Sequence, residues 1–149
     1  RYEISAFSKK NFECKHNLNY WRFGDYIAVG AGAHGKYRLT NDDMIRYQNA
    51  SNPNIYMKNL ISNKSSHKEK LLSSSDKIFE FMLNNLRLMS GFSIAHFESA
   101  TGLKYDAIEK KLSELNNLKL MKYYPSGYWK PTALGFKFLD NLQCEFLKV

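Results

Sequence analysis

The 149-residue chain has few of the residues that stabilise small extracellular domains. It contains two cysteines, Cys14 and Cys144, and three prolines. Two cysteines make no disulfide framework, so we expect a reducing, cytoplasmic location. The apolar runs are far shorter than the roughly 18 residues that a membrane-spanning helix needs. The sequence opens "RYEISAF", without a secretory leader or a starting methionine, and this indicates a piece of a longer protein.

Catalytic and metal-binding motifs are also missing. The sequence has no G-x-S-x-G, no H-E-x-x-H and no Walker loop. Cys14 and His16 form a C-x-H pair, but a structural zinc needs four ligands and no second cysteine lies near. No nucleophile, base or metal constellation therefore identifies an enzyme from the residues alone.

A single histidine or cysteine can still be an axial ligand of haem iron. Aromatic residues surround His16 in the sequence, among them Tyr20 and Trp21, and Lys15 and Arg22 are cations suited to haem propionates. From composition alone, His16 is either such a ligand or a structural histidine of a loop.

What the chain does have is positive charge and enough apolar residues for a core. The net charge is +8, hydrophobic residues make up 44% and aromatic residues 15%. Residues 1–74 hold twelve Lys and Arg against six Asp and Glu, so most of the basic excess lies in the first half. The composition predicts a folded protein rather than a disordered one.

The first half is predicted as strands and short helices. Residues 2–8 and 25–33 favour strands, the second buried on both faces because its apolar run is nearly continuous. Residues 12–24 show no clear periodicity and are predicted as a structured loop. Asn41 is expected to cap a helix that ends near Pro53. Further segments are predicted as a short strand at 36–40, a helical turn or two at 54–61 and a polar linker at 62–76.

The second half has helical periodicity. Helices are expected over 76–89, 94–101, 105–118 and 133–149, with a hairpin around Pro125-Ser126-Gly127. This order predicts a winged-helix-like domain. Its candidate recognition helix, "YDAIEKKLSELNN", carries a net negative charge, which suits neither phosphate contacts nor counterion release. We therefore expect no DNA binding.

The stretch Gly30–Gly35, "GAGAHG", matches the G-x-G-x-x-G pattern of dinucleotide-binding turns. In that fold the pattern opens a helix, and an acidic residue lies about 20 residues further on. Here "KYRLT" follows instead, and "ASNPNIYMKN" in the expected window holds no acid. A dinucleotide fold is excluded on this context. Close approach of the backbone to some ligand stays open, because these residues carry almost no side chain.

The stretches "YEIS", "ECKHNLNYWRFGDYIAVGAGAHG" and "LRLMSGFSIAHFESATGL" resemble one family, the oxygen-independent coproporphyrinogen III oxidase-like radical SAM proteins. "HNLNYW" makes the chain most similar to the haem-chaperone branch. The resemblance implies an α+β fold, with the terminal strands of a partial β/α barrel followed by the helical winged-helix-like domain. It also implies a [4Fe-4S] cluster and S-adenosylmethionine in the parent protein. The C-x3-C-x2-C-type cluster motif is absent from this chain.

The resemblance also suggests site residues. It implies that His16 is a haem ligand, with Cys14 as a weaker candidate and Tyr20 and Trp21 beside them. It further implies that the backbone approaches the S-adenosylmethionine adenosine at three residues of the glycine stretch, namely Gly32, Ala33 and His34.

Three regions follow from this comparison: a barrel end at 1–40, a connection at 41–74 and a C-terminal domain at 75–149. The expected function is that of a haem chaperone fragment that binds haem and delivers it to client haemoproteins, and that is not catalytic alone. Two alternatives stay open, namely coproporphyrinogen III oxidation by the parent protein and a nucleic-acid- or protein-binding module. Strands cut from a barrel expose backbone, so self-association is also expected.

Overall fold

The computed structural model describes residues 1–39 and 42–147 and mixes helices with two small antiparallel sheets. The α+β class expected from the sequence is confirmed. The chain forms two compact units, one of residues 1–24 and 74–149 and one of residues 25–73. The predicted cap Asn41 lies outside the described residues.

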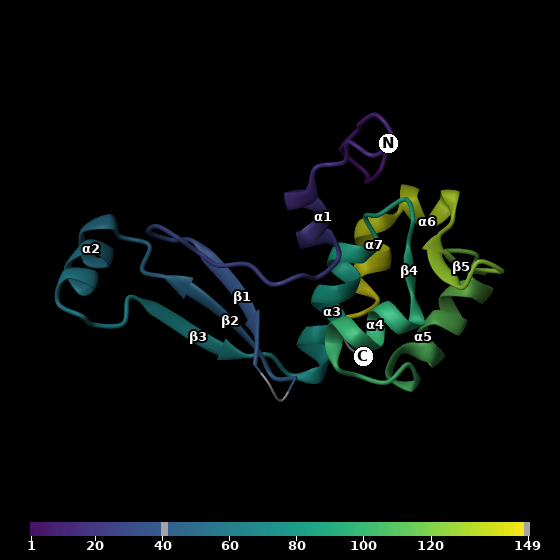
Figure 1. Ribbon diagram of the computed structural model, residues 1–149. Helices are drawn as coiled ribbons and strands as arrows, with labels where there is room; N and C mark the ends of the chain where they lie inside the picture. Colours follow the sequence, from purple (N-terminus) through teal and green to yellow (C-terminus); the bar gives the residue numbers. More distant parts are fainter. Residues whose placement is uncertain (40–41, 148–149) are drawn as a thin grey trace. The chain divides into compact units, whose positions relative to one another are not determined.

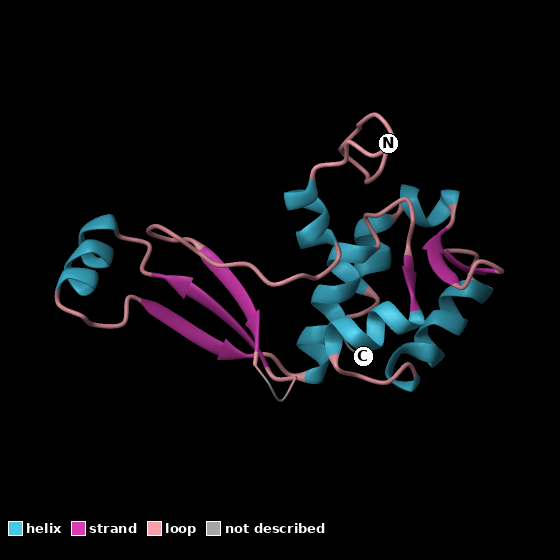
Figure 2. Cartoon of the chain, in the orientation of Figure 1, coloured by secondary structure: helices cyan, strands magenta, loops and turns pink. Residues whose placement is uncertain are grey.

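The first unit contains most of the helices (Figures 1 and 2). Its elements are α1 (Lys15–Trp21), α3 (Ser74–Asn85), β4 (Phe92–Ser93), α4 (Ile94–Thr101), α5 (Asp106–Asn117), β5 (Met121–Tyr124), β6 (Tyr128–Pro131), α6 (Ala133–Lys137) and α7 (Leu139–Cys144). The three strands form a sheet in the order β4-β6-β5.

The core of this unit is built on the helical periodicity of the sequence. Phe81 lies at its centre and makes edge-to-face contacts with Phe92 and Phe97, with ring centroids 5.2 Å apart in both pairs. Ile108 and Leu112 of α5 are buried as their spacing predicts. Removal of this apolar surface from water is the main force that holds the helices together.

Local signals place the ends of these helices correctly. The Ser93 side chain accepts the N–H of His96 at the start of α4, and Gly102 ends that helix in the left-handed conformation. Thr132 caps α6 through the N–H of Gly135. The predicted hairpin forms, with Gly127 at φ 83° in its turn. The single helix predicted over 133–149 is wrong: it is interrupted at Phe138, whose backbone leaves the helical region between α6 and α7.

The second unit is a three-stranded antiparallel sheet with one helix (Figure 1). Its elements are β1 (His34–Arg38), β2 (Met44–Asn49), α2 (Pro53–Ile61) and β3 (His67–Leu71). The strands lie in the order β1-β2-β3, with Tyr37 opposite Ile45 and Ile45 opposite Leu71.

The expected helix after position 41 is therefore wrong, because residues 44–49 form the central strand. Pairing on both edges outweighs the helix signals, and β-favouring residues such as Tyr47 suit a strand. The predicted linker over 62–76 is also wrong, because it contains β3. The helical turns at 54–61 are confirmed, and Asn52 caps them by accepting the N–H groups of Asn54 and Ile55.

Three more predictions for the first 33 residues are corrected. Residues 2–8 form no strand: the chain turns back, and the Glu3 carboxylate accepts the Ser5 N–H at 2.9 Å. Residues 12–24 are not a loop, because α1 lies within them. Residues 25–33 form no buried strand, since Ile27 and Val29 are each 84% exposed and the chain bends at the glycines that follow.

Candidate functional site

The four residues expected to bind haem all lie on α1 or at its N-cap. Cys14 is the N-cap residue and is exposed, as is His16 in the first turn. Tyr20 stands one turn further along, and its ring meets the imidazole edge-on, with centroids 4.8 Å apart. The structure thus brings His16 and Tyr20 onto one face of the helix, as residues four apart must be.

Trp21 lies on another side of α1, because five residues separate it from His16. Its ring is covered by the Arg87 guanidinium, whose central carbon is 4.3 Å from the ring centroid. The Trp21 indole N–H is buried without a hydrogen-bond partner among the described residues. Trp21 therefore attaches the helix to the protein instead of joining the His16 face.

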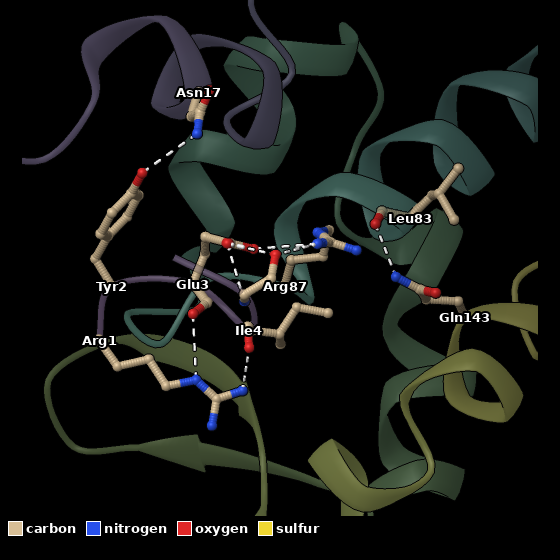
Figure 3. A network of polar contacts seen from close by, with 9 residues as sticks. Arg1, Tyr2, Glu3, Ile4, Asn17, Leu83, Arg87 and Gln143 are labelled. Carbon is tan, nitrogen blue, oxygen red and sulfur yellow. Dashed lines mark hydrogen bonds and ion pairs between the residues drawn. The ribbon is translucent and has the colours of Figure 1, made fainter. Parts of the chain in front are cut away.

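A network of polar contacts holds the N-terminal segment to the end of α3 (Figure 3). Arg87 donates to the Glu3 carboxylate at 3.2 Å and to the Ser5 hydroxyl at 3.1 Å. Glu3 is 1% exposed. Burial alone would raise the pKa of Glu3, but the hydrogen bonds from Ser5 and the charge of Arg87 lower this pKa below its ordinary value. The Asn17 amide of α1 donates to the Tyr2 hydroxyl at 3.4 Å.

The C-terminal end of α1 is fixed to the core. Phe23 is 2% exposed and makes an edge-to-face contact with Phe81 at 5.9 Å. The Nε2–H group of His96 donates a hydrogen bond to the carbonyl oxygen of Arg22, with 3.1 Å between the two heavy atoms. Burial lowers the pKa of His96, and the hydrogen bond to the Arg22 carbonyl oxygen opposes this shift only in part. The His16 side chain in the first turn of α1 is therefore exposed, while the other end of the helix is anchored to the core.

The cations expected near a haem are also on this helix. Lys15 and Arg22, together with Leu18 and Asn19, line an open depression of about 250 Å³. His16 is not one of its lining residues. The arrangement offers an exposed imidazole, an aromatic neighbour and two cations on the surface, rather than an enclosed cavity. An exposed neutral imidazole is able to ligate a metal.

The glycine stretch forms a bend before β1 and belongs to the second unit. Gly32 has φ +72°, and its N–H donates to the Ala50 carbonyl oxygen at 3.0 Å. The Ala33 carbonyl oxygen accepts the Asn49 N–H at 2.9 Å. His34 is exposed at the first position of β1. The residues predicted for the adenosine thus lie in one bend, in a different unit from the haem candidates.

Side chains of the second unit already use several N–H groups near this bend. The Tyr47 hydroxyl accepts the N–H of Ala28 at 2.7 Å, and the Tyr56 hydroxyl accepts that of Gly30 at 3.3 Å. The buried Asn49 amide donates to the Gly30 carbonyl oxygen at 2.8 Å. These contacts fix the bend from within the protein, so a nucleoside here would meet small side chains rather than free backbone donors.

Gly35 has a purely structural reason to be glycine. A Cβ atom at this position would lie 2.2 Å from the Tyr47 ring, which covers the strand there. The last glycine of the dinucleotide-like pattern is therefore explained by packing.

The residues present do not fit an iron–sulfur cluster. Within the described residues no group of three or more His, Cys, Asp or Glu could hold a metal ion. Cys14 and Cys144 are both free and exposed.

Reasoning from the sequence missed the residues that position α1. Glu3 was placed in a strand, and Arg87 and His96 were given no role. Their contacts join residues 84 and 74 positions apart, so no local pattern signals them. A glutamate within an otherwise strand-like segment is the one hint that the sequence offers.

Comparison with known proteins shows the family of the chain. The HemN C-terminal domain matches residues 72–136. "Heme chaperone HemW" of Haemophilus influenzae is 35% identical over 99% of the chain, and its namesake from Buchnera aphidicola subsp. Acyrthosiphon pisum is 38% identical over 99%. The chain belongs to the HemW-like family. It spans 37% of the length of the Haemophilus HemW and 38% of the Buchnera protein.

A solved structure shares the fold. Coproporphyrinogen III oxidase (HemN) of Escherichia coli, described as a radical SAM enzyme, aligns with a TM-score of 0.55 at 18% identity, over 83% of this chain and 28% of HemN. The likeness concerns the fold alone. No helix in the described part of the chain is long and apolar enough to cross a membrane.

Proposed function

We propose that this HemW-like chain carries part of the haem-binding surface of a haem chaperone, with His16 as the iron ligand. The observation that carries the proposal is the exposed His16 imidazole on a helix whose other end is fixed by Phe23, Trp21 and the His96 bond. A preorganised ligand loses less conformational entropy on binding than a mobile one. The names of the relatives support haem as the ligand.

Each of the other candidates has a defined part in this proposal. The Tyr20 ring stands beside the imidazole and offers an apolar edge to the porphyrin, while Lys15 supplies a cation for a propionate. Trp21 acts indirectly, because its contact with Arg87 orients the helix. Cys14 is two residues from His16 and exposed, and it is the alternative ligand when His16 is removed.

A titration of the chain with haem tests the proposal. We expect His16→Ala to weaken binding and to shift the Soret band, because the axial imidazole is lost. His34→Ala is the matched control, since His34 is also exposed but lies in the second unit. An unchanged affinity and an unchanged Soret band in His16→Ala would remove His16 from the site.

The whole protein is proposed to follow the family arrangement. In it, residues 1–40 would adjoin a β/α barrel, residues 41–74 would connect, and residues 75–149 would form a winged-helix-like domain. S-adenosylmethionine would approach Gly32, Ala33 and His34, and the cluster would be held by residues outside this chain. Delivery of haem to client haemoproteins in the cytoplasm completes the proposal.

The alternative for the whole protein is coproporphyrinogen III oxidation. An anaerobic assay of the full-length parent with S-adenosylmethionine and a reductant separates the two. We expect no protoporphyrinogen, and its formation would overturn the chaperone proposal.

A further inference from the structure

The first unit contains an open pocket whose lining includes none of His16, Cys14, Tyr20 and Trp21. It has a volume of about 610 Å³ and is lined by Arg22, Leu88, Ser90, Gly91, Ser93, His96, Ser126, Tyr128 and Lys130. These residues come from the end of α1, the segment before α4, the first turn of α4 and the β5–β6 hairpin. The volume lies within the range of small-molecule sites, about 300–1,000 Å³.

The charges that line this pocket are all positive. Arg22 and Lys130 contribute cations, and no Asp or Glu is among the lining residues. Among the described residues, neither side chain forms an ion pair or a hydrogen bond. Lys130 lies 5.3 Å from the Tyr124 ring centroid, and Lys122 stands opposite Lys130 in the sheet at the same distance from that ring. Uncompensated cations that converge on a hollow attract anions.

The polar groups between these cations suit an oxygen anion. Ser93 and Ser126 line the pocket with hydroxyl groups that can donate to an anion, while the Ser90 hydroxyl donates to the Gly91 carbonyl oxygen at 3.4 Å. Ser93 begins α4, so the helix directs its partial positive charge toward the same region. The His96 ring is held by its bond to the Arg22 carbonyl oxygen, and this bond fixes the backbone from which the guanidinium extends.

We propose that this pocket binds the oxyanion group of a small molecule, either a carboxylate or a phosphate. Arg22 and Lys130 neutralise its charge, and the hydroxyl groups of Ser93 and Ser126 complete its hydrogen bonds. Arg22 also lines the depression beside Lys15, but His16 is not part of this pocket, and the proposal does not depend on haem binding.

Titration of the ¹⁵N-labelled chain tests the proposal, with inorganic pyrophosphate in one arm and succinate in the other, at constant ionic strength in chloride. We expect shifts confined to the amides of Ser90, Gly91, Ser93 and His96. Arg22→Gln and Lys130→Gln should each weaken binding about tenfold or more, since each removes a charge-assisted hydrogen bond. Lys110→Gln removes an equal charge from an exposed position on α5 and should leave the affinity unchanged.

The two arms distinguish the source of the anion. Tighter binding of pyrophosphate identifies a phosphate-bearing ligand, and tighter binding of succinate a carboxylate. Absence of localised shifts in both arms, or equal weakening by Lys110→Gln, overturns the proposal. Because haem is not used, this failure is distinct from failure of the His16 titration.

Discussion

The position of each aromatic residue on α1 relative to His16 determines which side chain it contacts. Tyr20 is four residues away and meets the imidazole, while Trp21 is five away and meets Arg87. The sequence places all of them in one short motif, and proximity in sequence suggests a shared role. Helix geometry separates them into a residue beside the proposed ligand and a residue that anchors the helix.

At the residue scale, we predict that Glu3→Gln destabilises the first unit by about 1–3 kcal/mol at neutral pH, because Arg87 loses its buried partner. The lowered pKa of Glu3 means that its contribution is complete above the ordinary value of 4.5 and is lost as pH falls through the lower folded value. Urea unfolding followed by tryptophan fluorescence measures the free energy of unfolding, because Trp21 and Trp129 both lie in the first unit.

The free energy of unfolding at acidic pH provides the check on this prediction. The difference between the native chain and Glu3→Gln should shrink as pH falls below about 4.5, while Glu109→Gln on α5 serves as a control with little effect. A difference that stays constant from neutral to acidic pH would show that the charge of Glu3 is not what stabilises the segment.

At the element scale, β1 depends on the contact between Gly35 and Tyr47. The ring covers the glycine, and its hydroxyl accepts the Ala28 N–H, so one side chain joins β2 to both β1 and the preceding segment. Gly35, the last glycine of the pattern that resembles a dinucleotide-binding turn, is thus required for packing against the Tyr47 ring.

We predict that Gly35→Ala destabilises the second unit by about 1–3 kcal/mol, because the added methyl group would displace the Tyr47 ring. The change should also move the amide resonance of Ala28 and speed its hydrogen exchange. His34→Ala, at the exposed neighbouring position, is the control. Equal stability of Gly35→Ala and the native chain would mean that the ring moves aside at no cost.

At the scale of the whole molecule, the two units differ in their buried apolar residues. In residues 25–73, the described apolar side chains that are buried are Met44 and Leu72, while the remaining buried apolar residues belong to the first unit. Ile27 and Val29 are largely exposed in the second unit. A unit with little buried apolar surface opens with a small free energy.

We therefore predict that the amides of β1, β2 and β3 exchange with solvent at least tenfold faster than those of α3 and α5. Hydrogen exchange followed by mass spectrometry or NMR measures both units in one sample. Equal protection of the sheet and helix amides from hydrogen exchange would contradict the prediction that the second unit opens more readily than the first.

Self-association through strand edges stays a prediction. β3 is an edge strand in the described sheet, and its five residues, His67–Leu71, are all exposed. Lys68 and Lys70 lie on it, and lysines on an edge oppose pairing between copies.

The sequence by itself determined the second half of the molecule as far as α6, whereas the break at Phe138 before α7 was not predicted. Helix caps at Ser93 and Thr132, the Gly127 turn and the apolar spacing of α5 are local signals, and each acts within a few residues. The family was indicated separately, by the resemblance of "HNLNYW" and the stretches around it to the haem-chaperone branch. The same resemblance indicates His16 as a candidate ligand, and a short sequence pattern singles out the glycine stretch.

Only the tertiary structure decided the first half. Residues 44–49 carry helix signals and yet form a central strand, because hydrogen bonds to β1 and to β3 stabilise the extended backbone on both edges. The role of Trp21 and the polar pocket at Arg22 depend on Arg87 and Lys130, which are 66 and 108 positions further along the chain. Contacts at such separations are set by packing, and no local pattern records them.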